Sequence, residues 1–201
     1  MYKRQGIPAS SFIAVLSAAG LTIGLAFQGS LSNFAGGVLI LLFKPFKIGD
    51  FVKEDVHGNE GLVEGIDLFY TRMRTFDNKM VIIPNGSLAN TSITNYTANN
   101  KRRIEIKVGI SYDSDMKRAK DILMNVINSQ DGILKNEDNK VYVDALEESQ
   151  ITIGTMAWVM TDDYWKIKWE LTEKFKNALD DAGIEIPFNQ LSVTINEKQR
   201  K

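Results

Sequence analysis

The sequence predicts an apolar membrane helix followed by a small all-β domain and an α+β domain. Three observations lead to this class. The 39 residues from Gln5 to Phe43 contain no Asp, Glu, Lys or Arg, whereas a bilayer span needs only about 20 apolar residues. Residues 48–97 carry short apolar runs separated by turn residues, which is typical of strands. Residues 101–195 then show strand and helix periodicities in the order β-α-β-β-α-β, which indicates a ferredoxin-like domain.

Composition and charge exclude several classes of function. The chain has 24 basic and 25 acidic residues and a net charge of −1, whereas a nucleic-acid-binding surface is normally strongly basic. It has no cysteine, hence no disulfide framework and no Cys-ligated metal. The single histidine, His57, lies in the turn-like segment VHGNEG, where we expect an exposed loop residue. We find no catalytic constellation and no Gly-rich phosphate loop, so we expect no enzyme, cofactor or metal site.

The apolar segment is unusually rich in small residues. Glycines stand at positions 20, 24, 29, 36 and 37, and each costs a helix interior about 1 kcal/mol relative to alanine. In a membrane, close packing against neighbouring helices compensates for this cost. A secretory signal peptide is the alternative, but the uncharged run continues far beyond any cleavage point near Ala18 and Ala19.

The helical phases of these residues predict a closed ring of helices. With Ala14 at zero, Leu21 and Leu25 fall at about −20° and +20° and form one line, called here the leucine seam. Small residues flank it on both sides, as a ring requires, and bulky ones lie opposite. The predicted packing residues are Ala14, Ser17, Ala18, Gly20, Thr22 and Gly24. We therefore expect Leu21 and Leu25 to form a pore constriction, the alternative being that both leucines face lipid.

Below the seam, Gln28 and Gly29 are polar and flexible enough for a kink in the helix. From Leu31 the spacing becomes amphipathic and predicts a second helix at the membrane interface. Its apolar side would carry Leu31, Phe34, Val38, Leu41 and Leu42. Pro45 disfavours helix in the residue before it, so we expect the helix to end there.

The β domain is expected to have five short strands. Asp77-Asn78 and Pro84-Asn85-Gly86 are interpreted as turns between them. Arg72, Arg74 and Lys79 could form a nucleic-acid patch, but stacking aromatics at regular spacing are lacking, so we favour no nucleic-acid partner.

In the α+β domain, Asp113 and Asp115 precede a predicted helix, where capping is a better interpretation than metal binding. The residues Lys101-Arg102-Arg103 are expected to be a solvated linker face. Trp165 and Trp169 are placed on the buried face of the second helix, with Thr172, Phe175, Leu179 and Ala182, and Trp158 is also expected in the core. Leu191, Val193 and Ile195 alternate as a final strand.

Several ordered motifs resemble the small-conductance mechanosensitive channel (MscS-like) family. They are LSAAGLTIGLAFQGSLSNFAGG, LLFKPFKIGD, MRTFDNKMVIIPNGSLAN, VGISYDSD and AGIEIPF. The resemblance implies an Sm-like fold for the β domain, a lower helix roughly parallel to the membrane, and a final strand that joins a barrel with its neighbours. It also implies seven copies, a bacterial-type inner (plasma) membrane and C-terminal domains in the cytoplasm.

The resulting expectation has four segments. Residues 1–43 form the pore-lining and interfacial helices, 44–98 the Sm-like domain, 99–188 the α+β domain, and 189–201 the C-terminal strand and tail. The expected function is a channel subunit that opens under membrane tension and releases ions and small solutes during hypo-osmotic shock. Its partners would be further copies of itself, which form heptamers in the resembled family, and the lipid bilayer. The alternative is a membrane-anchored, ring-forming binding module without its own pore. Members of the resembled family have further membrane helices before the pore helix, so we expect a fragment of a longer protein.

Overall fold

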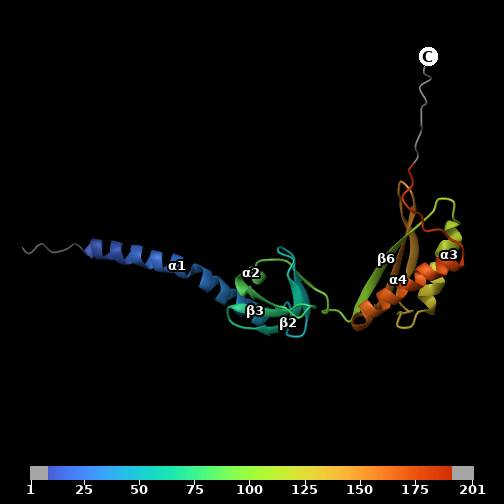
Figure 1. The fold of residues 1–201 in the computed structure, drawn as a ribbon. Helices are drawn as coiled ribbons and strands as arrows, with labels where there is room; N and C mark the ends of the chain where they lie inside the picture. Colours follow the sequence, from blue (N-terminus) through green and yellow to red (C-terminus); the bar gives the residue numbers. More distant parts are fainter. Residues whose placement is uncertain (1–8, 192–201) are drawn as a thin grey trace, which may run out of the picture. The chain divides into compact units, whose positions relative to one another are not determined.

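The computed structural model describes residues 9–191. The chain divides into two compact units between Ala98 and Asn99. The first unit contains a long helix and an all-β domain, and the second an α+β domain (Figure 1). This is the fold class that the sequence predicts.

Helix α1, Ala9–Phe43, is a single helix of 35 residues. It ends where Lys44 adopts a positive φ of 50° and donates its backbone N–H to the carbonyl of Ile40, just before Pro45. The predicted interruption at Gln28 and Gly29 is absent, because the helical backbone continues through both residues. A lone glycine weakens a helix by about 1 kcal/mol without breaking it, and among residues 9–191 nothing outside the helix's own backbone comes within 4 Å of a Cβ placed at Gly29.

The β domain is an antiparallel sheet of five strands in the order β4-β3-β2-β1-β5. The strands are β1 Phe51–Glu54, β2 Glu60–Ile66, β3 Tyr70–Arg74, β4 Met80–Pro84 and β5 Ile93–Asn95. The expected turn at Pro84-Asn85-Gly86 is wrong, because Asn85 begins a short helix, α2, Asn85–Ala89. Side chains from the sheet, α2 and the end of α1 share one core, namely Ile40, Phe46, Val52, Val63, Met73, Ile83 and Leu88.

The second unit contains a three-stranded antiparallel sheet in the order β6-β8-β7. Its elements are β6 Lys101–Ile110, α3 Met116–Ser129, β7 Lys140–Leu146, β8 Ile151–Met160, the short 3₁₀ helix η1 Thr161–Asp163 and α4 Tyr164–Asp181. Helices and sheet enclose a single core, which includes Ile104, Leu123, Ile127, Ile153, Ala157, Leu171 and Phe175. The predicted order β-α-β-β-α is present. Leu191 lies outside any strand, and Val193 and Ile195 lie outside the described residues.

The buried face of α4 differs from the predicted one. Trp165 and Trp169 are 44% and 66% exposed, so their placement in the core is wrong. The buried residues of the helix are Ile167, Leu171, Phe175 and Leu179. Ile167 and Leu171 lie about 120–160° around the helix from both tryptophans. Phe175 and Leu179 belong to the predicted face and are buried as expected. Trp158, on β8, is half-buried.

Candidate pore helix and its junction with the β domain

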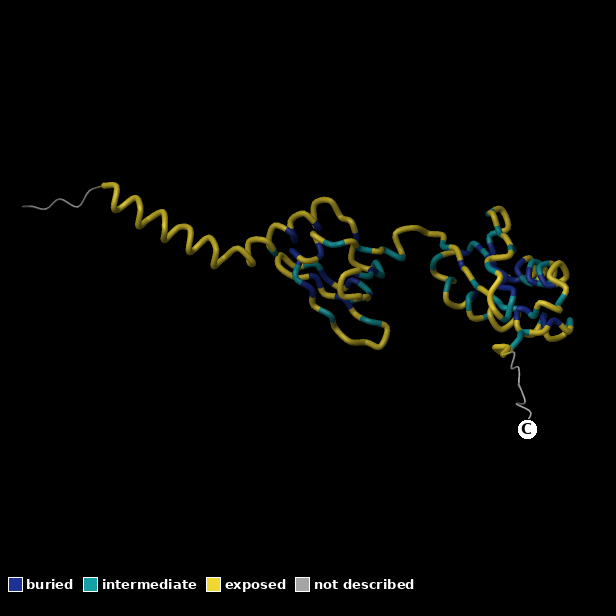
Figure 2. Tube along the Cα trace, turned by 90° about the horizontal axis from the view of Figure 1, so that it is seen from above, coloured by how far each residue is buried: buried dark blue, intermediate teal, exposed yellow. Residues whose placement is uncertain are grey.

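The upper part of α1 carries the leucine seam on a regular helix, so the angular positions derived from the sequence apply to the structure. Leu21 and Leu25 are 66% and 62% exposed, and within the described part of the chain nothing beyond the helix's own backbone lies within 4 Å of a Cβ placed at Gly20 or Gly24. Figure 2 shows this part of the helix exposed along its length. The seam and both small-residue faces are therefore open for contacts outside the single chain, and their roles remain predictions.

Thr22 fits an apolar packing face despite its hydroxyl group. Its Oγ1 donates a hydrogen bond of 2.8 Å to the carbonyl oxygen of Ala18, one turn earlier. The polar group is thus satisfied within the helix itself, which is a common arrangement for threonine in helices.

The lower part of α1 docks on the β domain through one narrow face. Gly36, Gly37 and Ile40 are its buried residues, and together with Asn33 they follow the i, i+3, i+4, i+7 spacing of a single helix face. A Cβ at Gly37 would lie 2.2 Å from the carbonyl oxygen of Leu68, and one at Gly36 would lie 2.6 Å from that of Asn85. Only glycine allows the helix backbone to approach the domain this closely.

The partner of this face is built around Asn85, which is fully buried. Its Nδ2 donates to the carbonyl of Asp67 over 2.7 Å, and its Oδ1 accepts from the hydroxyl of Thr71, also over 2.7 Å. Its backbone N–H donates to the carbonyl of Phe69 over 2.9 Å. Three bonds thus fix the start of α2 against β3 and the loop before it.

A hydrogen bond connects α1 directly to this fixed point. The backbone N–H of Gly86 donates to Oδ1 of Asn33 over 3.0 Å, and the rings of Phe34 and Phe69 lie 6.0 Å apart. We call Asn33, Gly36, Gly37, Asn85 and Gly86 the junction.

The junction corrects one prediction about the lower helix. The apolar side expected at the membrane interface, which includes Leu31 and Leu42, is exposed in this chain, and its contact with the membrane stays a prediction; the docked side consists mainly of small residues. Gly36 and Gly37 were expected to serve helix packing in the membrane, but in this chain they serve contact with the β domain. The spacing of Asn33, Gly36, Gly37 and Ile40 was the sequence signal for this contact.

Other predicted site residues have structural roles. Asp115 caps α3, because its carboxylate accepts the backbone N–H of Arg118 over 3.0 Å; the capping prediction is confirmed for this residue. Lys101 and Arg103 belong to β6 and form ion pairs with Glu137 and Glu105, while the guanidinium carbon of Arg102 lies 3.6 Å from the Tyr164 ring centroid. The expected solvated linker face is therefore a paired strand surface.

His57 has an exposed side chain, as expected, but it contacts a buried carboxylate that the sequence did not reveal. Its Nδ1 lies 3.3 Å from Oε2 of Glu54, whose side chain is 3% exposed. Glu54 also accepts the backbone N–H groups of Val56 and His57. Burial by itself raises the pKa of Glu54, but these backbone bonds outweigh it and hold the pKa below the ordinary 4.5. The carboxylate orders the β1–β2 turn.

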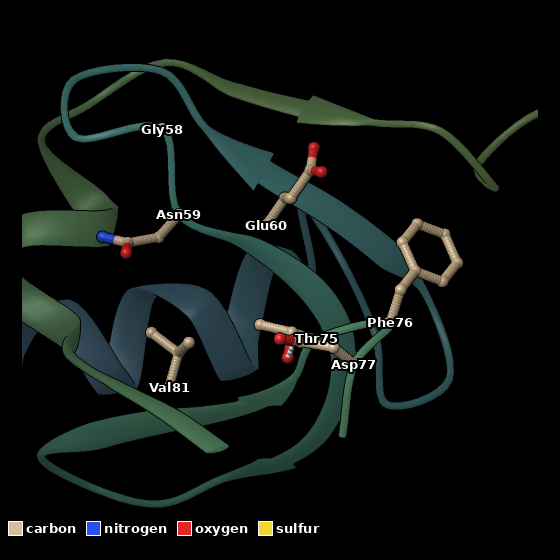
Figure 3. Close-up of a pocket in the computed structure, with 7 residues that line it drawn as sticks. All are labelled: Gly58, Asn59, Glu60, Thr75, Phe76, Asp77 and Val81. Carbon is tan, nitrogen blue, oxygen red and sulfur yellow. Dashed lines mark hydrogen bonds between the residues drawn. The ribbon is translucent and has the colours of Figure 1, made fainter. Parts of the chain in front are cut away.

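The hollow beside the β1–β2 turn contains no buried carboxylate comparable to that of Glu54 (Figure 3). It measures about 340 Å³ and is lined by Gly58, Asn59, Glu60, Thr75, Phe76, Asp77 and Val81. The Thr75 hydroxyl donates to Asp77 over 2.6 Å, and Asp77 pairs with Lys79 over 2.6 Å, so this carboxylate already has partners. Within residues 9–191, no three His, Cys, Asp or Glu side chains are grouped to hold a metal ion.

Helix α1 is the one helix within residues 9–191 that is long and apolar enough to cross a membrane. At 1.5 Å per residue, the part above the junction, residues 9–32, extends about 36 Å, which exceeds the roughly 30 Å hydrocarbon core of a bilayer. The junction therefore leaves enough helix for one complete span.

Comparison with known proteins matches both folded parts of the chain. The family described as "Mechanosensitive ion channel, beta-domain" matches residues 29–98, and "Mechanosensitive ion channel MscS, C-terminal" matches residues 104–186. The small-conductance mechanosensitive channel of Edwardsiella ictaluri is 42% identical over 88% of this chain and 61% of that protein. The channel of the same name from Helicobacter pylori is 34% identical over 96% of this chain and 70% of that protein.

Solved structures agree with this assignment. The crystal structure of H. pylori MscS in its closed state has a TM-score of 0.89 and 34% identity, covering 96% of this chain and 76% of that one. Arabidopsis thaliana MSL1 shares the fold, with a TM-score of 0.79, 19% identity, and coverage of 92% of this chain and 66% of that one. The chain belongs to the MscS family of mechanosensitive ion channels.

Proposed function

We propose that this chain lines the pore of a tension-gated channel and forms its cytoplasmic domains, and that the channel releases ions and small solutes during hypo-osmotic shock. The observation that carries the proposal is the leucine seam on α1, which lies between two faces of small residues. The channel is placed in a bacterial-type inner membrane and assembles from several copies of the chain, seven by analogy with the family. No catalytic role is proposed.

The two small-residue faces support a ring. Ala18 and Thr22 lie on one side of the seam, at about +40° and +80°, and Gly20 and Gly24 lie on the other side, at about −120° and −80°. A helix in a simple pair needs only one such face, whereas a helix in a closed ring contacts a neighbour on each side. The side of the helix between the two faces then faces the ring axis, and Leu21 and Leu25 lie on that side.

A ring of leucine side chains can close a pore without filling it. Water leaves a narrow apolar constriction, and ions that would have to shed their hydration cannot pass, which is gating by dewetting. Membrane tension opens such a ring if the open state occupies the larger area in the membrane plane, because tension then favours that state.

The junction supports a proposal about which part of α1 moves during gating. Below Asn33 the helix is fixed, since Gly36 and Gly37 are in direct contact with backbone atoms of the β domain. Tilting or rotation of the upper helix must therefore be taken up between the seam and the junction, in residues 28–32. Gln28 and Gly29 begin this stretch, and we keep them as the kink of the assembled channel.

The proposal is tested by expressing the full-length gene that encodes this chain in bacteria lacking their own mechanosensitive channels. Survival after sudden dilution of the medium should rise to the level given by a known channel. The control is the same gene with Gly24→Leu, which we expect to insert in the membrane but not to open. Normal membrane insertion of the unmodified protein without any gain in survival would favour the alternative, a membrane-anchored binding module without a pore.

A further inference from the structure

The junction contains a dipeptide whose chemistry the proposed function does not use. Asn85-Gly86 is the one Asn-Gly pair in the 201 residues of this chain. An asparagine that precedes glycine loses its side-chain amide more readily than one that precedes any other residue, because glycine has no side chain to hinder attack by its backbone nitrogen. The surroundings of the pair therefore decide whether it is modified.

The reaction exchanges one amide bond for another. The backbone nitrogen of Gly86 loses its proton and attacks Cγ of Asn85. A bond forms between these two atoms, the bond from Cγ to Nδ2 breaks, and Nδ2 leaves as ammonia together with the proton. Water then opens the cyclic imide at either of its two carbonyl carbons, which gives aspartate or isoaspartate. The steps consume only water, and nothing is oxidised or reduced.

In the docked chain the attacking nitrogen is held by α1. The Gly86 N–H donates to Oδ1 of Asn33 over 3.0 Å. The first N–H groups of a helix have no partner within the helix, and Pro84, which precedes α2, has no side-chain group that could accept one. Asn33 supplies this acceptor from another helix. Because the nitrogen must give up its proton to attack, the bond to Asn33 opposes the reaction.

The asparagine is fixed by two side-chain hydrogen bonds and by burial. Its Nδ2 donates to the carbonyl of Asp67 and its Oδ1 accepts from the hydroxyl of Thr71, each over 2.7 Å. The residue is fully buried, so the water that opens the imide has no access to it. The Asn85 side chain turns toward the Gly86 nitrogen only if these bonds break, and buried polar groups without partners are unfavourable.

Helix α1 also covers the dipeptide. A Cβ at Gly36 would lie 2.6 Å from the carbonyl oxygen of Asn85, and a Cβ at Gly37 would lie 2.6 Å from its Nδ2. The backbone of α1 thus lies directly on Asn85. When α1 leaves the β domain, it uncovers the asparagine and releases the Gly86 N–H in the same step.

We infer that Asn85 is a modification site which docking of α1 protects, and that loss of its amide makes undocking permanent. Aspartate places an oxygen atom where Nδ2 now donates to the Asp67 carbonyl, and a carboxylate has no proton to donate there. Isoaspartate lengthens the backbone at the start of α2. Either product prevents α1 from docking as before. The inference depends on the junction and not on whether the pore conducts.

The test follows the amide of Asn85 by mass spectrometry. The full-length protein in detergent is incubated at mildly alkaline pH, digested, and the peptide that contains Asn85 is analysed. In the folded, unsubstituted protein we expect the amide to persist, whereas in denaturant it should be lost. Asn33→Leu should speed the loss at least about fivefold, since a broken buried hydrogen bond raises the open population by about that factor or more.

A second variant and two controls keep the test specific. Gly37→Ala pushes α1 away without removing the bond to Gly86 and should also speed the loss. Leu31→Ala changes an exposed residue of the same helix and should not. Asn99, which is exposed, should convert to the same extent in all variants.

Three results would overturn the inference. One is loss of the Asn85 amide in the folded protein as fast as in denaturant. Another is an unchanged rate in both Asn33→Leu and Gly37→Ala, whether or not hydrogen exchange in residues 85–89 rises. The third is an acceleration that is equal at Asn99, because it would reflect general unfolding.

The permanence of undocking has its own readout. Asn85→Asp is the aspartate product made in advance, and it should show faster hydrogen exchange in residues 33–40 of α1. Asn99→Asp makes the same chemical change at an exposed position and should leave that exchange as it is. Equal exchange in Asn85→Asp and the unsubstituted protein would contradict permanent undocking.

Discussion

Gly37→Ala should loosen the junction between α1 and the β domain. The new Cβ would lie 2.2 Å from the carbonyl oxygen of Leu68 and 2.6 Å from Nδ2 of Asn85, whereas ordinary contacts of this kind exceed about 3.4 Å. One neighbour is backbone and the other is held by two hydrogen bonds, so the helix has to move by about 1 Å. Overpacking of this kind costs about 1–3 kcal/mol, while the helix itself gains about 1 kcal/mol from losing a glycine. Because the nearest atom is backbone and cannot turn away, we take the upper part of that range, about 2–3 kcal/mol, and expect a net loss of roughly 1–2 kcal/mol.

Hydrogen exchange measured by mass spectrometry checks this expectation. A loss of 1–2 kcal/mol corresponds to about 5- to 30-fold faster opening, and we expect it in peptides that cover residues 67–71 and 85–89. Gly29→Ala is the matched control, since it makes the same change in the same helix where no described residue outside the helix's own backbone lies within 4 Å of the new Cβ. It should leave these peptides unchanged. Equal exchange in the two variants would refute the argument that the junction requires a glycine.

Three further changes test other parts of the account. Gly24→Leu should fill the small-residue face of α1 and prevent opening in patch recordings, and normal gating would contradict close helix packing there. Asn33→Leu removes the acceptor of the Gly86 N–H and should cost about 1–3 kcal/mol, seen as faster exchange at Gly86, with Leu31→Ala as the control at an exposed site. Glu54→Gln should lower the free energy of unfolding of the β domain at pH 7 by about 1–3 kcal/mol. Because the pKa of Glu54 is lowered below 4.5, its contribution is present above that pH and disappears as the pH falls through the folded-state pKa. The melting temperatures of the two proteins should therefore converge in acid, and a constant difference at all pH values would count against the charged carboxylate.

Much of the fold could be predicted because its signals are local. The uncharged run before Lys44 predicted α1, and the alternation of Ile104, Ile106, Val108 and Ile110 predicted β6. These patterns depend only on which side chains must avoid water, and they need no knowledge of the partner.

The wrong predictions concern residues whose burial depends on which other segment of the chain packs against them. Helix α4 carries two apolar stripes, one with Trp165 and Trp169 and one with Ile167 and Leu171, and only the packed sheet determines which one is buried. Gly36 and Gly37 indicate that another segment comes close to the helix backbone, but they do not show which segment it is. A glutamate next to a turn is usually exposed, so burial of Glu54 could not be recognised before its N–H donors were in place.

The most direct test of the central claim is the tension threshold of Leu25→Ser in the full-length channel. A hydroxyl ring tolerates water where a leucine ring excludes it, so the dewetted constriction should become wet. We expect opening at clearly lower tension than in the unmodified channel, with Ile23→Ser, on the opposite side of α1, as the control that leaves the threshold in place. An unchanged threshold in Leu25→Ser would contradict the assignment of the leucine seam to the pore.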